Sequence, residues 1–263
     1  MNWHFLSFFT RRSFLAIFLA FSCLLVLTAA QDKTKKKPTL KKTETSAKKK
    51  ESATKKKKAI AKADITDCNI PFEGSERKGV KMRKPGQKYT LHNGGRAVTV
   101  SEFYSYVSGL VDGVPSQRKL VPDDEPLKAE KLTMKVKGYL MAGKSEDDND
   151  FHLQISEKPE WKELTQLVVE IPPGEEYCEA RNNYIKLVEA QPKGTARKCI
   201  FTNPPLVEVT GYLFLDASHM RKQRTDYATD NGGRGVRGGG MKTSPVRGIW
   251  ELHPVTKLEL VKK

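Results

Sequence analysis

The chain has 263 residues, of which 30% are charged, and its formal net charge is +16. Most of this charge comes from residues 31–62, which hold fourteen lysines against three acidic residues. The chain after residue 62 is therefore nearly neutral, and the composition excludes a globular domain that is itself strongly basic.

The first thirty residues have the features of an export signal. Arg11 and Arg12 precede an apolar run over 13–27, and Thr28-Ala29-Ala30 offers small residues at a cleavage site. A run of about fifteen apolar residues is shorter than the roughly twenty that cross a bilayer, so removal is favoured over anchoring. The arginine pair fits a secretory or a twin-arginine signal. We expect a signal peptide over 1–30 and a periplasmic or extracellular protein.

A lysine-rich tail follows over 31–64. It has almost no large apolar side chain, so it cannot bury enough surface to offset its ordering entropy, and we expect it to be disordered. Such a tail could adsorb to anionic lipid, to cell-wall polymer or to nucleic acid, or it could be a solvated spacer. An envelope polyanion is thus one candidate partner.

Three cysteines remain after the signal: Cys68, Cys178 and Cys199. An odd number leaves at least one thiol unpaired or bonded between molecules. A bridge from Cys178 to Cys199 is favoured, because it would close a loop of about twenty residues and contribute roughly 3 kcal/mol in the chain-entropy model. No C-x-x-C pair is present, which disfavours a zinc knuckle or a thioredoxin-type site.

Hydrophobic patterns predict the elements in chain order. Residues 65–128 form an amino-terminal extension with an apolar run at 98–110, which fits a strand or a helix. From residue 129 the patterns predict strands over 131–141, 151–155 and 165–171, a helix over 175–191, and strands over 206–216 and 249–261. Gly138 and Gly211 interrupt two of these strands, where a bulge or bend is expected.

Three strands, a helix and two more strands are the order of the OB-fold, a five-stranded Greek-key barrel. We therefore predict a mainly β chain in which residues 129–263 form an OB-like barrel, with one helix between strands three and four. A plain β-sandwich would need about seven strands. A long loop over 217–247 separates the last two strands and carries seven basic residues against two acidic ones.

Several motifs resemble those of a family of exported bacterial proteins without an assigned function. They are Asp148-x-Asp150-Phe151-His152-Leu153, Val169-Glu170-Ile171-Pro172, Val207-x-Val209-Thr210-Gly211, and Glu251-Leu252-His253-Pro254-Val255. Gly74-Ser75-Glu76-Arg77 is similar to the amino-terminal motif of that family. Members usually have a tryptophan after this arginine and a His-Gly-Gln loop after the fourth strand, where this chain has Lys78 and His219-Met220-Arg221. The resemblance implies an OB-like fold and no reaction.

Strand alternation predicts one polar face. If Phe151, Leu153 and Ile155 point into the barrel, Asp150 and His152 point outward. The same rule places Glu170, Glu251 and His253 outside, on strands that neighbour each other in an OB barrel. Together with loop arginines, this face gives the candidate ligand-binding residues, which are Asp150, His152, Glu170, Glu251, His253, Arg234 and Arg237. The candidate metal ligands are Asp150, His152, Asp216, His219 and His253.

These residues leave several functions open. Asp148 and Asp150 also suit a hairpin turn, and no close H-x-H or H-x-x-x-H spacing supports a metal. Ser218 beside His219 lacks a G-x-S-x-G elbow, so no nucleophile is identified and a non-enzymatic role is favoured. The favoured function is an exported OB-fold binding module of the envelope or the extracellular space. The alternatives are a metal-dependent hydrolase that uses the acidic face, and a polyanion binder that uses the tail and the loop. An acidic face disfavours nucleic acid there.

Overall fold

The computed structural model describes residues 64–84, 86, 89–110, 112–162, 164–220 and 235–262. The predicted signal peptide and nearly all of the predicted tail lie outside these residues, as does the part of the basic loop that contains Arg234. Within the described part of the chain, no helix is both long enough and apolar enough to cross a membrane.

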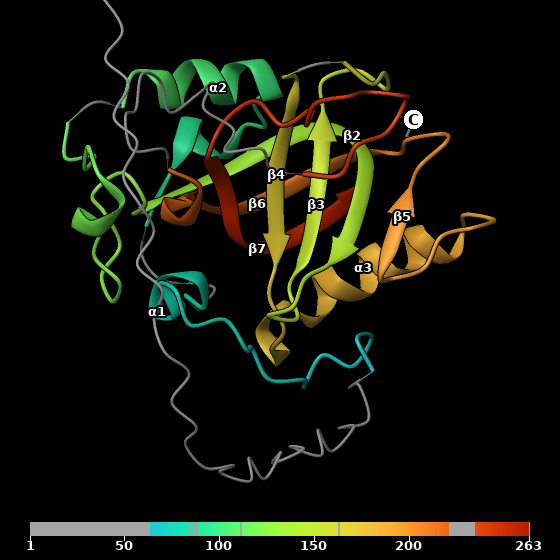
Figure 1. Ribbon diagram of the computed structural model, residues 1–263, viewed down its shortest axis with the longest axis horizontal. Helices are drawn as coiled ribbons and strands as arrows, with labels where there is room; N and C mark the ends of the chain where they lie inside the picture. Colours follow the sequence, from blue (N-terminus) through green and yellow to red (C-terminus); the bar gives the residue numbers. More distant parts are fainter. Residues whose placement is uncertain are drawn as a thin grey trace, which may run out of the picture. The chain divides into compact units, whose positions relative to one another are not determined.

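Five strands close into a barrel (Figure 1). Each pairs with two others in the order β2-β3-β4-β7-β6-β2, and all pairs are antiparallel except β4 with β7. Helix α3 connects the third barrel strand to the fourth, as the OB order requires. The predicted fold is therefore confirmed. The barrel elements are β2 (Leu132–Ser145), β3 (Phe151–Ser156), β4 (Gln166–Ile171), α3 (Cys178–Glu189), β6 (Leu206–Leu215) and β7 (Trp250–Leu260).

The long strand β2 closes the barrel because its two halves pair with different neighbours. Its first half pairs with β6 and its second half with β3. Gly138 lies at the change-over, where a Cβ atom would come within 2.8 Å of the Ser156 carbonyl oxygen. The β2–β3 register shifts between Leu140 and Ala142, and the β6–β7 register shifts at Gly211. The glycines thus permit the close approach of strands on which closure depends.

The remaining elements are short. Strands β1 (Thr90–Leu91) and β5 (Lys198–Ile200) extend the sheet from β2, and neither has a recognisable sequence pattern. Helix α2 (Val100–Ser108) begins at a Thr99–Glu102 capping box, so the apolar run at 98–110 is mainly helical. The other helices are α1 (Lys78–Lys81), η1 (His92–Gly95), η2 (Arg118–Leu120), η3 (Glu175–Tyr177) and η4 (Ala217–His219).

The barrel interior is apolar, as the alternation predicts. Phe151, Leu153 and Ile155 of β3 join the hydrophobic core together with Trp250 and Leu252 of β7. The outer faces of β3 and β4 are buried as well, since all six residues of each strand are shielded from solvent. This double burial means that other parts of the chain cover the outside of the barrel.

The amino-terminal extension is one of these covers, and buried arginines fix it in place. Arg77 makes two hydrogen bonds to the Glu130 carboxylate, at 2.6 and 2.7 Å. Arg83 donates to the carbonyl oxygens of Glu130, Leu213 and His253. Because each guanidinium has several fixed acceptors, the extension is tied to β6 and β7.

The predicted Cys178–Cys199 bridge is wrong. The disulfide joins Cys68 to Cys178, and Cys199 is a buried free thiol. Cys178 begins α3, beside the extension, where Gly174 donates its N–H to the Cys68 carbonyl at 2.8 Å. Cys199 instead lies against Gly194, just beyond the other end of α3. A helix of twelve residues is about 18 Å long, so the two thiols cannot meet.

Candidate functional site

The pairing of three strands gathers the predicted polar residues on the outside of the barrel. His152 of β3 is the cross-strand partner of Glu170 on β4. The parallel contact between Val169 and Leu252 sets Glu170 beside the segment of β7 that carries Glu251 and His253. We call this group the outer-face cluster. It consists of Asp150, His152, Glu170, Glu251 and His253, and all five are buried.

Glu170 is the centre of the cluster because each of its oxygens contacts a different histidine. Its Oε1 atom lies 2.7 Å from His152 Nδ1, and its Oε2 atom lies 2.8 Å from His253 Nδ1. Burial alone would raise the pKa of Glu170, but the hydrogen bonds from the two histidines hold it well below its usual value. Glu170 is therefore an ionised carboxylate that orients both imidazole rings.

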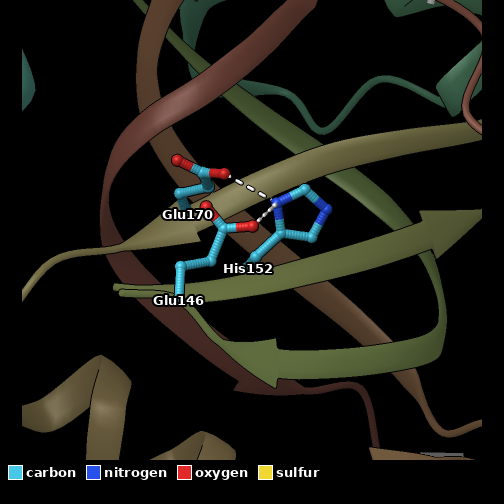
Figure 2. Close-up of side chains that lie close together, drawn as sticks. All are labelled: Glu146, His152 and Glu170. Carbon is cyan, nitrogen blue, oxygen red and sulfur yellow. Dashed lines mark hydrogen bonds and ion pairs between the residues drawn. The ribbon is translucent and has the colours of Figure 1, made fainter. Parts of the chain in front are cut away.

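Glu146 belongs to the rim of the site and was missed by the sequence analysis. Its Oε1 atom lies 3.3 Å from His152 Nδ1, so the ring nitrogen is flanked by two carboxylates (Figure 2). Its side chain is 31% exposed and comes from the turn between β2 and β3. A shallow pocket of about 410 Å³, lined by residues 144–148, opens at this turn. The acidic turn sequence was the only available signal, and it fits an ordinary hairpin equally well.

Asp150 is the least satisfied group of the cluster. Its side chain is fully buried, yet neither carboxylate oxygen accepts a hydrogen bond from any residue that the structure describes. The Oδ2 atom lies 3.2 Å from His253 Nε2, at ion-pair distance but without hydrogen-bond geometry. Burial raises the pKa of Asp150 to about 7, although His253 opposes this shift. His253 therefore faces the charge of Asp150, but both carboxylate oxygens still lack a hydrogen bond of ordinary geometry within the described residues.

The two histidines differ in their contacts, because both ring nitrogens of His253 face carboxylates whereas one ring nitrogen of His152 does not. His152 Nε2 is buried and has no hydrogen bond within the described part of the chain. Burial would lower the pKa of His253, but Asp150, Glu170 and Glu251 raise it well above the ordinary value. His253 therefore carries a proton that a metal ion would have to displace, since imidazole binds metals in its neutral form.

Two segments cover the outer face around the cluster. Residues 235–247 cross β3 and β4. The Val236 carbonyl accepts a hydrogen bond from the Gln154 side-chain amide, and the Val236 N–H donates to the oxygen of the same amide. Arg247 donates its N–H to the Gln166 carbonyl. Lys81 and Arg83 of the extension cover the other end, through Asp148 and the His253 carbonyl. The outer face that binds polymers in many OB-folds is thus covered by the chain itself. A ligand of the cluster must be small.

Ligand atoms come close enough to hold one metal ion in two groups of described residues. One group is Asp150, Glu170 and His253, and the other is Glu146, His152 and Glu170, each with ligand atoms within 4.8 Å of one another. Neither group includes Asp216 or His219, which pair with each other at 2.5 Å. Arg237 is exposed, and Arg234 lies outside the described residues.

The contacts of Ser218 do not form a catalytic triad. Its hydroxyl contacts Asp216 Oδ1 and also His219 Nδ1, the same ring nitrogen that contacts Asp216 Oδ2. In a triad the serine and the carboxylate contact opposite ring nitrogens. The contacts of Ser218 with His219 and Asp216 thus differ from those of a triad serine.

Comparisons with family models, with curated proteins and with solved structures found no match. The resemblance to a family of exported bacterial proteins, drawn from the sequence motifs, stays a prediction.

Proposed function

We propose that this protein is an exported OB-fold binding protein whose outer-face cluster binds a divalent metal ion through Asp150, Glu170 and His253. The buried Asp150 carboxylate carries this proposal, because both of its oxygens lack a hydrogen bond within the described residues and it faces a histidine 3.2 Å away. A metal ion would bind the Asp150 oxygens that lack a hydrogen bond, and the Oε1 atom of Glu170 would continue to orient His152.

The donor set limits which ions would bind. Two carboxylates and one imidazole suit Zn²⁺ and Mn²⁺, whereas Ca²⁺ prefers six to eight oxygen ligands. Glu170 and His253 come from β4 and β7, and Asp150 is the residue immediately before β3, so the barrel strands fix the positions of all three side chains. Export and adsorption through the lysine-rich tail remain part of the proposal and rest on the sequence, because residues 1–63 lie outside the described part of the chain.

Calorimetric titration of tag-free protein, stripped with a chelator, tests the proposal. We expect one equivalent of Zn²⁺ or Mn²⁺ to bind, and Asp150→Asn to weaken this binding at least about a hundredfold, because it removes one charged ligand. Asp147→Asn is the matched control, since Asp147 lies in the same turn and is exposed. The proposal fails if neither ion binds stoichiometrically, or if the Asp150 variant binds as well as the wild type.

A further inference from the structure

Lys81 is partly exposed and differs from the two buried arginines of the extension. Arg77 and Arg83 each donate several hydrogen bonds to fixed acceptors. The Lys81 ammonium group donates none to any described residue, and its one ion pair, to Asp148 Oδ2, is 3.7 Å long. The side chain is 17% exposed, so it reaches the solvent as well as Asp148, which lies two residues before Asp150 of the cluster.

The Lys81 ammonium group lies near the cluster without a hydrogen bond to it. The ammonium group lies 5.9 Å from the centroid of the Phe214 ring, and Phe214 also packs beside His253. Burial would lower the pKa of Lys81, but Glu170, Glu251 and Asp150 together raise it above the ordinary value. Lys81 is thus a permanent positive charge held by the field of the cluster and not by directed contacts.

A lysine held in this way can leave without breaking a directed contact, and a divalent ion would replace the attraction that its charge gives up. No hydrogen bond is broken when the ammonium group turns outward, and the four-carbon stem is flexible. By contrast, a divalent ion beside Asp150 and Glu170 would be repelled by the ammonium group if it stayed. The two cations therefore compete for the same carboxylates.

We infer that Lys81 is the resident counter-ion of the metal site: it balances the carboxylates when no metal is bound and turns outward when a divalent ion binds, so that α1 sets the affinity of the site. This inference rests on the proposed function. In this role the extension controls how tightly the metal binds, whereas a purely structural cover would not affect metal binding.

Lys81→Met tests the inference, because it keeps the length of the side chain and removes the charge. We expect the variant to bind Zn²⁺ at least about tenfold more tightly than the wild type, with a lower melting temperature when metal-free. Lys81→Arg keeps the charge and should bind as the wild type does. Lys84→Met is the matched control, since Lys84 follows on the same segment and is 78% exposed.

A measurement on the wild type protects the test against a variant that folds poorly. Reductive methylation followed by peptide mapping should modify Lys81 faster in the presence of saturating Zn²⁺, while Lys84 is modified at an unchanged rate. Equal or weaker binding by Lys81→Met, or methylation of Lys81 that does not respond to an ion that binds, overturns the inference and leaves the proposed function intact. If neither wild type nor Lys81→Met binds metal, the proposed function itself fails.

Discussion

Replacing Asp150 with asparagine should stabilise the metal-free protein. The substitution keeps the shape of the side chain and removes a buried carboxyl group. Burial raises the pKa of this group from 3.8 to about 7. Each pKa unit corresponds to 1.36 kcal/mol, so the raised pKa lowers the unfolding free energy of the wild type by about 2 kcal/mol at about pH 5, where folding takes up a proton, and by about 4 kcal/mol at about pH 8, where the buried group is charged. The expected gain for Asp150→Asn therefore grows as the pH rises.

The sign follows from proton binding. Because the folded pKa lies above the unfolded one, the native state binds more protons between about pH 4 and pH 7, and the contribution of Asp150 to stability falls as the pH rises through this range. Urea unfolding in the presence of a chelator, at about pH 5 and about pH 8, measures the difference, with Asp147→Asn as the exposed control. An Asp150→Asn protein that is less stable than the wild type at about pH 8 would refute the reasoning, since it would show that the carboxylate is already satisfied.

Two further predictions concern the extension and the thiols. Arg77→Met should lower the unfolding free energy by about 3–5 kcal/mol, because it leaves the Glu130 carboxylate buried and unpaired, and urea unfolding measures the loss; a loss under about 1 kcal/mol would contradict it. Iodoacetamide should not label Cys199 in the native protein, where this thiol is 2% exposed and burial raises its pKa, but should label it after denaturation. Cys68 and Cys178 should react only after reduction, so their labelling in unreduced, denatured protein would disprove the disulfide.

Local patterns were sufficient to predict the barrel. The alternation of Phe151, Leu153 and Ile155 fixed which face of β3 is apolar, and the break after Ile171 at two prolines marked the end of β4. Strand β5 was not predictable, because three residues are too few for a period of two to appear. The disulfide was not predictable either, because the pairing depends on where the extension docks against α3.

The composition of the cluster could be predicted, but its environment could not. Strand alternation placed His152, Glu170 and His253 on one face. Their burial depends on contacts between residues far apart in the chain, such as that of Arg83 with the His253 carbonyl, which no local pattern encodes. Lys81 was missed for the same reason, since it ends a four-residue helix whose sequence does not indicate which groups it faces.

The hydrogen bonds of Arg83 have a consequence for assembly during synthesis. Arg83 is synthesised early, whereas its acceptor, the His253 carbonyl, lies in β7 and is synthesised 170 residues later. The extension and β7 can therefore meet only after β7 has been synthesised. A chain that stops before β7 lacks both a strand of the barrel and the imidazole of His253, so it cannot assemble the outer-face cluster.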